Sequence, residues 1–212
     1  MGVTSAGEEE RLLAMGDAFA ARVVERAAPV AFRFADSPQD REAVYRLRYR
    51  TVVERGWADP AECPDGMERD GFDDRAVHLT GWAGEELAAV ARLVFPIPGT
   101  LLPTEEAFGV RIEPAGRVAD LSRTIVASRY RDPDHRVFLG LLARCWQEVR
   151  ARGYVVACGD AADWLLDRYR EMGLRIEVLG PPLPFWGEDR RPFRCDVLAS
   201  TRAAVGRLSG RM

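Results

Sequence analysis

The sequence contains no lysine and no asparagine. All 30 of its basic residues are therefore arginines, a bias that is typical of a GC-rich genome, so their number alone indicates no arginine-specific chemistry. The 33 acidic residues outnumber them and leave a formal net charge of −3 at pH 7. This balance argues against broad nucleic-acid binding, which needs a basic surface that releases phosphate counterions.

Cysteine and histidine are also scarce. The two histidines and four cysteines are scattered, and no two cysteines form a CxxC pair. The sequence therefore has no signature of a zinc site or of a disulfide framework. We expect reduced, mostly buried cysteines, no metal site and no permanently bound cofactor.

Long apolar runs are missing as well. No run approaches the roughly 20 residues that a membrane-spanning helix needs. The first residues, MGVTSAGEEERLLAMG, are acidic where a secretory signal would be basic and then apolar. We therefore expect a cytoplasmic protein whose 212 residues, 47% of them hydrophobic, bury one main core.

The chain is predicted to form one main domain with additions at both ends. Residues 9–27 carry apolar side chains at helical spacing, so residues 1–28 are expected to form a helical extension that packs on the domain. Residues 29–205 are expected to form the main domain, and residues 206–212 a tail.

Within the main domain, strands and helices follow each other in an order typical of an α/β sheet protein. Ser37 followed by Pro38 predicts a helix N-terminus, and residues 56–75 are rich in Gly, Pro and Asp and predict a long loop. The expected strands cover residues 29–36, 76–82, 86–95, 117–127, 154–158, 174–180 and about 193–199; the expected helices cover 38–54, 136–152 and 163–173. Early antiparallel strands followed by a strand-helix-strand crossover imply a mixed, mostly antiparallel sheet with helices on both sides.

Three arginines occupy positions where the periodicity predicts apolar side chains. Arg48 shares a helical face with valines four residues away on each side. Arg92 alternates with valines in its strand. Arg123 alternates with Leu121 and Ile125 in the next strand, which places Asp120 on the opposite face.

A buried arginine needs a carboxylate partner, because breaking such a pair typically costs ~3–5 kcal/mol. The candidates are Asp70 and Asp73 in the long loop and Asp120 in the strand. We predict salt bridges between the loop acids and at least one of the arginines, near the mouth of a pocket. The alternative is that some of the arginines extend along the domain edge to water.

Four short segments between residues 44 and 126 include these charged residues. They are VYRLRYRTVVERGW from residue 44, DGMERDGFD from 65, ARLV from 91 and DLSR from 120. In this order they resemble the motifs of acyl-homoserine-lactone synthases and of the related N-acyl amino acid synthases. The resemblance implies a GNAT-like acyltransferase fold.

The resemblance also implies roles for individual residues. Arg48 and Trp57 match positions that shape the amine-substrate pocket, and Asp70 and Asp73 match acids that fold the loop over the site. Arg92 matches the arginine that these families have in one strand. Asp120 and Arg123 match the acid and the arginine of the next strand. Val52 stands where lactone synthases usually have Phe, and Asp120 where they usually have Glu, which weakens the case for lactone formation.

An amine that attacks a thioester must be deprotonated, and the oxyanion that forms must be stabilised. A GNAT-like site is expected to supply a backbone N–H from the strand that contains Asp120 and Arg123, the two expected catalytic residues. Asp120 is the candidate base, although it could instead only pair with an arginine. Its use as a base requires burial to raise a pKa of about 3.9.

The thioester donor is expected to bind beside the same strand. The expected donor contacts are Ile125, Val126, Arg131, Arg136, Gly140 and Arg144. The stretch SRYRDPDHRVFLG from residue 128 has no RGxG, so a pyrophosphate cradle is poorly developed. Its arginines suit an acidic acyl carrier protein, or they form an ordinary solvated helix face. A gap between strands 117–127 and 154–158 is expected to hold the pantetheine arm.

These features favour an N-acyltransferase that moves an acyl chain, expected to be long, to the amine of an amino acid. The donor would be an acyl carrier protein or coenzyme A thioester. The first alternative is an acyl-homoserine-lactone synthase that uses S-adenosylmethionine. The second, from a different class, is a non-catalytic module that binds acyl thioesters.

Overall fold

The computed structural model of the protein describes residues 6–209. Its strands are β1 (Ala31–Phe34), β2 (Val77–Ala83), β3 (Glu86–Val94), β4 (Val118–Val126), β5 (Val156–Ala161), β6 (Arg175–Val178), β7 (Leu183–Phe185) and β8 (Glu188–Asp196). Its α-helices are α1 (Ala6–Glu25), α2 (Pro38–Glu54), α3 (Pro103–Phe108), α4 (Arg136–Ala151), α5 (Asp163–Met172) and α6 (Val197–Ser209).

The strands form one mixed sheet in the order β1-β2-β3-β4-β5-β8-β6, with β7 paired to β8. The pair β4–β5 is parallel, and the other neighbouring pairs are antiparallel. This arrangement confirms the predicted GNAT-like α/β fold with a mostly antiparallel central sheet.

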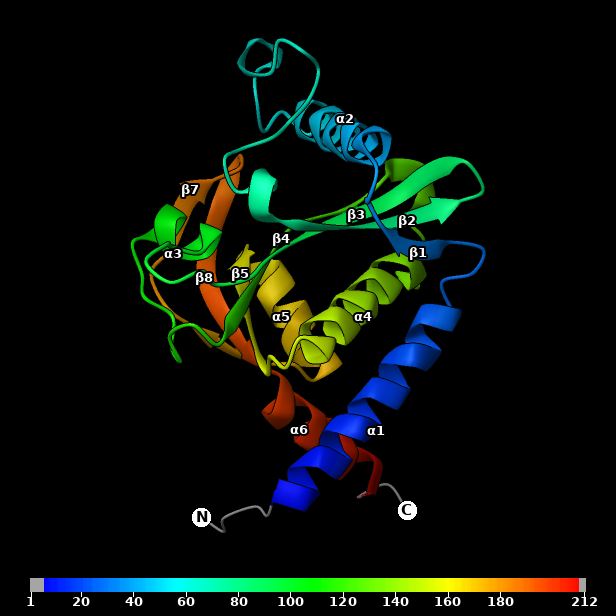
Figure 1. The fold of residues 1–212 in the computed structure, drawn as a ribbon, viewed down its shortest axis with the longest axis vertical. Helices are drawn as coiled ribbons and strands as arrows, with labels where there is room; N and C mark the ends of the chain where they lie inside the picture. Colours follow the sequence, from blue (N-terminus) through cyan, green and yellow to red (C-terminus); the bar gives the residue numbers. More distant parts are fainter. Residues whose placement is uncertain (1–5, 210–212) are drawn as a thin grey trace.

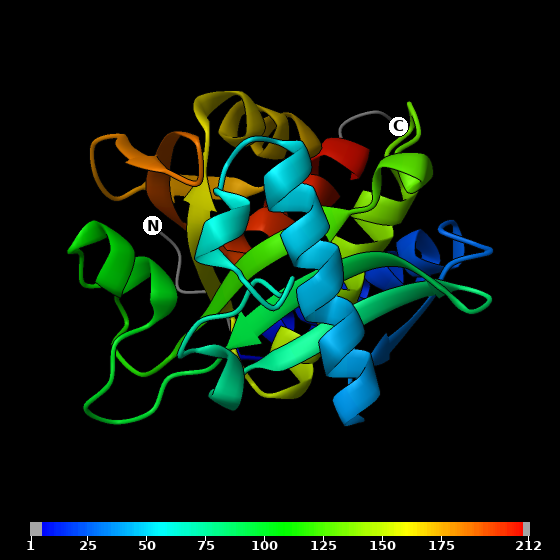
Figure 2. The same ribbon diagram turned by 90° about the horizontal axis from the view of Figure 1, so that it is seen from above.

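Helices cover both faces of the sheet. In Figure 1, α2 lies above the sheet and α1, α4 and α5 lie below it, while Figure 2 shows α2 lying across β3 and β4. Apolar side chains of α4, such as Leu141, pack on one face with Leu93 of β3. Val44 and Leu47 of α2 pack on the other face with Val90. The core is therefore divided into two layers by the sheet.

Local sequence signals explain the boundaries of α2 and α5. The side chain of Ser37 accepts a hydrogen bond from the backbone N of Asp40 at 3.0 Å, as expected for an N-cap residue. Gly173 ends α5 with φ of 97°, a conformation that glycine adopts without steric cost. Both boundaries agree with the predictions from the sequence.

Helix α1 packs against α4 and α6 at the bottom of the view in Figure 1. Gly16 allows this close approach, because a Cβ there would lie 2.8 Å from the Trp146 ring and 2.9 Å from the Thr201 hydroxyl. The Trp146 indole also donates to Asp17 at 2.9 Å. The helix is thus docked on the main domain, while the domain boundary after residue 28 stays a prediction.

Three elements were not predicted. Helix α3 has only six residues and begins at Pro103, between the strands predicted at residues 86–95 and 117–127. Strand β7 was hidden because Pro184 lies within its three residues. Helix α6 begins at Val197, so the prediction of a strand up to residue 199 is wrong, and the helix continues to Ser209 into the expected tail.

None of the helices within residues 6–209 is both long enough and apolar enough to cross a membrane. The expected cytoplasmic location stays a prediction.

Candidate active site

Six charged side chains gather between α2, the loop that follows it and the sheet. We call them the acid–arginine cluster: Arg48, Arg92, Arg123, Glu68, Asp70 and Asp73. Three cations face three anions, so the cluster carries no formal net charge. The predicted salt bridges between the loop acids and the arginines are confirmed. Glu68 was not predicted, because one more acid in an acid-rich loop stands out by neither spacing nor periodicity.

Arg48 is the buried centre of the cluster, with no side-chain exposure. Its Nη1 and Nη2 donate to the two carboxylate oxygens of Asp73 at 2.7 and 3.1 Å, and its Nε donates to Glu68. Bidentate arginine–carboxylate bonds of this kind are strong and directional. Each guanidinium nitrogen already has a carboxylate partner, so Arg48 is not available to a substrate carboxylate.

Arg92 connects the loop to the sheet. Its Nη1 donates to Asp70 at 2.6 Å and to Asp73 at 3.2 Å. Its Nε donates to the Ser122 hydroxyl on β4 at 3.1 Å. Like Arg48, Arg92 is almost completely buried and paired with protein acids. It therefore holds the loop against the sheet, while the role that the resemblance implied for the loop acids at a substrate site stays a prediction.

Arg123 is the most exposed arginine of the cluster, with 12% of its side chain accessible. Its Nη2 donates to Asp70 at 3.1 Å and to Glu68 at 3.2 Å. The indole ring of Trp186 lies 4.2 Å from its guanidinium carbon, in a cation–π contact. Arg123 therefore lies at the edge of the cluster, between the loop acids and the β7–β8 hairpin.

Two acids of the cluster, Asp73 and Glu68, remain ionised at neutral pH. Burial alone would raise the pKa of Asp73, but the hydrogen bonds and charge of Arg48, with the charge of Arg92, lower it to about 2. Burial would also raise the pKa of Glu68. The hydrogen bonds and charges of Arg48 and Arg123 outweigh this effect, so the pKa of Glu68 is lowered. The cluster is therefore a persistent ion network.

His78 lies beside the cluster on β2, opposite Arg92 in the ladder. Burial, together with the charges of Arg48 and Arg92, outweighs the opposite effect of Asp73 and lowers the pKa of His78 from 6.5 to about 4. Its Nε2 is 3.7 Å from Asp73 Oδ1. Neither ring nitrogen has a hydrogen-bond partner within residues 6–209. At neutral pH the imidazole is therefore uncharged.

Strand β4 contains a β-bulge at Arg123. The ladder pairs on either side are Ser122 with Arg92 and Ile125 with Val90, so β4 has one residue more than β3 between them. Arg123 has φ of 54°, a left-handed conformation that is uncommon for a residue other than glycine. The expected alternation of Arg123 with Leu121 is therefore wrong: Leu121 packs toward α4, whereas Arg123 lies on the α2 face beside Ser122.

Asp120 lies on this same face and not on the opposite one, because the bulge changes the alternation. It is fully buried next to α3, and its Oδ2 accepts bonds from the backbone N and the hydroxyl of Thr104 at 2.9 and 2.6 Å. Its Oδ1 has no partner in residues 6–209, and no ion pair within that range joins it to an arginine. The alternative role as an arginine partner is therefore wrong.

Burial also decides what Asp120 can do chemically. Burial, to which the charge of Asp160 adds, raises the pKa of Asp120 despite the bonds from Thr104. A raised pKa is one of the conditions that a base requires. The side chain has no exposed surface, however, so an amine cannot reach it in this conformation.

Strands β4 and β5 pair over three residues and then separate. Their last ladder pair is Asp120 with Cys158, although β4 continues to Val126. At Gly159 the two strands are still close, since a Cβ there would lie 2.7 Å from the carbonyl oxygen of Leu121, but no ladder pair joins them beyond Cys158. The predicted gap, which opens toward the C-terminal end of β4, is confirmed.

A tight turn covers the cluster from the side of β8. Trp186 and Gly187 connect β7 to β8 with φ of 52° and 70°, the pair of left-handed residues that is typical of a type I′ hairpin. A Cβ at Gly187 would collide with the indole of Trp57, so glycine is required for this contact. Trp57, expected in the amine pocket, also lies 5.0 Å from the guanidinium carbon of Arg190.

The expected donor contacts of β4 lie beside the gap. Ile125 packs under α2, and Val126 is the last residue of the strand. The carbonyl oxygen of Val126 accepts a bond from Arg131 Nε at 2.9 Å, which closes the following turn onto the strand end. Donor contacts by these three residues stay a prediction.

The N-terminus of α4 is occupied by a carboxylate of the protein itself. Asp132 accepts bonds from the backbone N of Asp134 at 3.0 Å and of Arg136 at 3.1 Å. The Arg136 side chain also pairs with Asp132 at 3.5 Å. A helix N-terminus attracts anions, and here Asp132 already supplies one. A pyrophosphate at this position would meet a like charge.

Two other expected donor contacts have a packing role. Gly140 is buried in α4, where a Cβ would lie 2.6 Å from Ala27 Cβ and 3.0 Å from the Phe32 ring, so its place is explained by close helix packing. The Arg144 guanidinium lies 5.1 Å from the Phe34 ring. Neighbouring arginines pair with acids: Arg129 with Glu86, Arg150 with Asp17 and Arg152 with Glu148. The expected basic helix face is thus partly neutralised.

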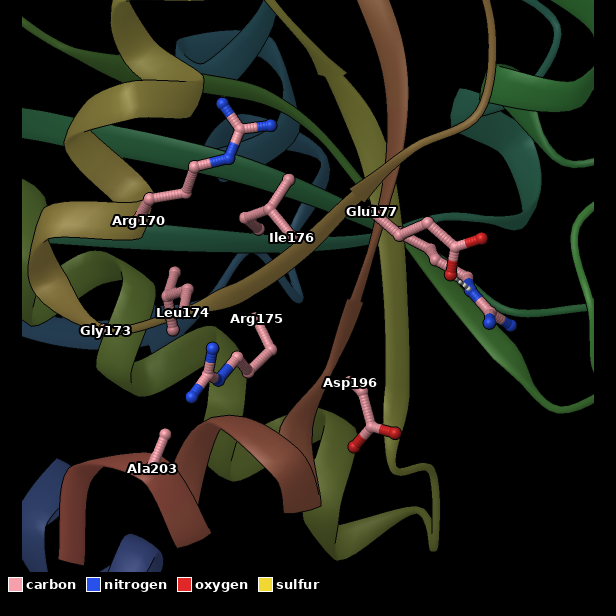
Figure 3. Close-up of a pocket in the computed structure, with 9 residues that line it drawn as sticks. Arg170, Gly173, Leu174, Arg175, Ile176, Glu177, Asp196 and Ala203 are labelled. Carbon is pink, nitrogen blue, oxygen red and sulfur yellow. Dashed lines mark hydrogen bonds and ion pairs between the residues drawn. The ribbon is translucent and has the colours of Figure 1, made fainter. Parts of the chain in front are cut away.

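A cavity of about 540 Å³ lies elsewhere, between the end of α5, β6, β8 and α6 (Figure 3). Its lining includes Arg170, Arg175 and Asp196, and the pair of Glu177 with Arg194 lies at one end. None of its lining residues belongs to the acid–arginine cluster. The location of the cluster at a pocket mouth stays a prediction. No group of His, Cys, Asp and Glu within residues 6–209 is arranged to hold a metal ion.

Comparisons with known proteins agree with this fold. Residues 47–141 match the family model described as the acetyltransferase (GNAT) domain. This range begins one residue before Arg48 and ends within α4, so it includes the whole cluster and β4. No curated protein matches the chain at the sequence level.

Several solved structures share the fold. TofI, solved in a ternary complex with an inhibitor and MTA, is 24% identical with a TM-score of 0.63, and the match covers 82% of this chain and 96% of that one. BjaI, a CoA-dependent acyl-homoserine lactone synthase solved with SAM and isopentyl-CoA, is 24% identical with a TM-score of 0.63. The match covers 84% of this chain and 89% of that one. FeeM, an N-acyl amino acid synthase from uncultured soil microbes, is 14% identical with a TM-score of 0.65. The match covers 82% of this chain and 94% of that one. The chain therefore shares the fold of these synthases, and its residues 47–141 match the acetyltransferase (GNAT) domain.

Proposed function

We propose that the protein transfers an acyl group from a thioester to the amine of an amino acid. The observation that carries this proposal is the gap between β4 and β5 next to the acid–arginine cluster. A gap in a sheet leaves backbone N–H and C=O groups without ladder partners, and a pantetheine arm is an amide-containing chain that can pair with them. The gap thus offers a thioester a place to bind in extended form.

The bulge at Arg123 suits the chemical step. The extra residue of a bulge lies outside the ladder, so its backbone N–H is free to donate to a ligand. An N–H that is fixed before the reaction stabilises the oxyanion that forms when an amine attacks the thioester carbon. The left-handed φ of Arg123 is a strained state that the cluster and Trp186 hold in place.

The acid–arginine cluster acts as the frame of the acceptor pocket. It fixes the loop after α2 to the sheet, which places Trp57 against the β7–β8 turn. Arg48 and Arg92 stay paired with the loop acids throughout, because releasing a buried ion from its partner costs several kcal/mol. Their contribution to acceptor binding is therefore to position the loop.

The acyl carrier protein is the preferred donor over free coenzyme A. Asp132 occupies the N-terminus of α4, where coenzyme A would need to place its pyrophosphate. A carrier protein brings the same pantetheine arm without that pyrophosphate at the helix end. Arg136, which is exposed, and Arg131 remain the contacts for an acidic carrier surface.

Product analysis tests the proposal. The purified protein is incubated with acyl-CoA and acyl-carrier donors of several chain lengths, together with each of the twenty amino acids or S-adenosylmethionine. Mass spectrometry is expected to detect an N-acyl amino acid, formed faster with the carrier donors. A lactone product from S-adenosylmethionine would instead identify a signal synthase, and donor binding without any product would identify a binding module.

A further inference from the structure

Asp160 and Arg190 form a second polar pair that borders the gap. Asp160 is the fifth residue of β5 and follows the last residue paired with β4, Cys158, by two positions. Asp160 therefore lies in the part of β5 that continues beyond its last pair with β4. The side chain of Asp160 is 10% exposed. An ionisable group therefore lies on the β5 side of the gap.

Arg190 holds this carboxylate from β8. Its Nη1 donates to Asp160 Oδ1 at 3.2 Å, and its Nη2 donates to Glu188 at 2.8 Å. Its guanidinium carbon lies 5.0 Å from the centre of the Trp57 ring, so the pair lies on the α2 face with the cluster. Arg190 is shared between two carboxylates, and Arg55 lies over the same Trp57 ring, with its guanidinium carbon 5.3 Å from the ring centre. Only Oδ1 of Asp160 accepts from Arg190, so its second carboxylate oxygen can accept a bond from an ammonium group.

The other acids of the site are less suited to receive an amine. Glu68 and Asp73 are buried and bonded to Arg48, and Asp70 bridges Arg92 and Arg123. Asp120 has no exposed surface. Asp160, by contrast, has a single arginine partner through one of its oxygens, and it is partly accessible at the gap.

We propose that Asp160 binds the ammonium group of the acceptor at the gap and takes its proton, with Arg190 as the positioning residue. This inference rests on the proposed acyl transfer. One proton passes from the acceptor ammonium to the Asp160 carboxylate, and the free amine then attacks the thioester carbon. The C–N bond forms, the C–S bond breaks, a second amine proton passes to the leaving thiolate, and Asp160 releases its proton to water.

The test compares Asp160→Asn with Asp163→Asn as the matched control. Asp163 begins α5 and pairs with Arg191 at 2.8 Å on the opposite face of the sheet. Each full-length variant is assayed with palmitoyl-carrier protein and the twenty amino acids, and separately with hydroxylamine. Hydroxylamine is largely uncharged at neutral pH, so it needs neither an ammonium site nor a base.

Asp160→Asn is expected to lower amide formation by about 100-fold or more, the usual size of a lost general base. Hydroxamate formation should stay within about threefold of wild type, because donor binding and the oxyanion site are intact. Asp163→Asn should leave both rates unchanged. Undiminished amide formation by Asp160→Asn would overturn the role of Asp160, and so would an equal loss of amide and hydroxamate. No amide from the wild type with any acceptor would instead overturn the proposed function.

Arg190 is tested through its conservative variant. Arg190→Gln is expected to lower kcat for amide formation about tenfold, whereas Arg190→Lys should recover a large part of that loss because it retains the charge next to Asp160. Arg191→Gln is the control on the other face. If Arg190→Lys is as impaired as Arg190→Gln, or if Arg191→Gln is impaired equally, the positioning role is wrong.

Discussion

Arg123 on β4 and Trp186 in the β7–β8 turn contact each other, with the guanidinium carbon 4.2 Å from the ring centre. Both residues have left-handed backbones, with φ of 54° and 52°. Neither is a glycine, so each conformation costs energy that neighbouring contacts must offset. The bulge of β4 and the turn of the β7–β8 hairpin therefore stabilise each other.

Loss of this contact should impair the transfer reaction. Trp186→Ala removes the ring that holds Arg123, and we expect kcat/KM for acyl transfer to fall at least tenfold, while unfolding free energy falls by about 1 kcal/mol. Trp164→Ala, at an exposed position of α5, is the matched control and should change neither quantity. Steady-state kinetics and urea unfolding measure both. Equal activity of the two variants would contradict this role of Trp186.

The buried cluster should dominate the stability of the loop after α2. Arg48→Met leaves Asp73 and Glu68 without their main cation, so we expect a loss of about 3–5 kcal/mol in unfolding free energy. Arg46→Met is the control, because Arg46 pairs with Glu42 on the exposed face of the same helix and should contribute less than about 1 kcal/mol. Urea unfolding distinguishes the two, and equal losses would show that the cluster adds no stability.

Stability should decrease in two steps as the pH falls. The pKa of His78 is about 4 in the folded protein and 6.5 in the unfolded chain. Between pH 6.5 and about 4 the unfolded chain therefore binds a proton at His78 that the folded protein does not, and the free energy of unfolding decreases as the pH falls. Asp73, whose pKa is lowered from 3.8 to about 2, adds a second loss below about pH 4.

A phenylalanine at position 78 separates the two steps. His78→Phe keeps an aromatic ring beside Tyr45 and removes the titrating group. Unfolding free energy measured in urea from pH 7 to 4 should then depend much less on pH than in the wild type. An unchanged slope in this window would show that another group causes the loss.

Donor preference should depend on Asp132. Asp132→Asn keeps a side-chain oxygen for the end of α4 and removes the negative charge, so we expect the KM for acyl-CoA to fall several-fold. The KM for the acyl-carrier donor should change by less than twofold. Asp134→Asn is the control, since only its backbone N bonds to Asp132. A KM for acyl-CoA that does not respond to Asp132→Asn would contradict the proposed exclusion of pyrophosphate.

Sequence periodicity predicted most of the sheet and the three arginines of the cluster. Arg48 could be identified because a charge on the apolar stripe of a helix must find a buried partner. The face of the sheet on which Arg123 lies could not be predicted from the sequence. A bulge at a residue other than glycine leaves no local signal in the sequence, and it reverses the alternation of side chains between the two faces that follows.

The second polar pair was missed for a different reason. The strand expected at 154–158 ends before Asp160, whereas β5 continues to Ala161. Arg190 lies between the strands predicted at residues 174–180 and about 193–199, where the sequence indicated no strand. Pairing with a distant strand, and not local propensity, forms β8 and places Arg190 next to Asp160.

The central claim is that this site joins a thioester acyl group to an amine. The most direct measurement is a single-turnover reaction with isotopically labelled acyl-carrier donor and the acceptor found in the product screen, in which free carrier thiol and amide are quantified together. The account predicts equal amounts of both, formed at the same rate and dependent on the acceptor. Thiol released at the same rate without acceptor, with no amide, would show a hydrolase and contradict the account.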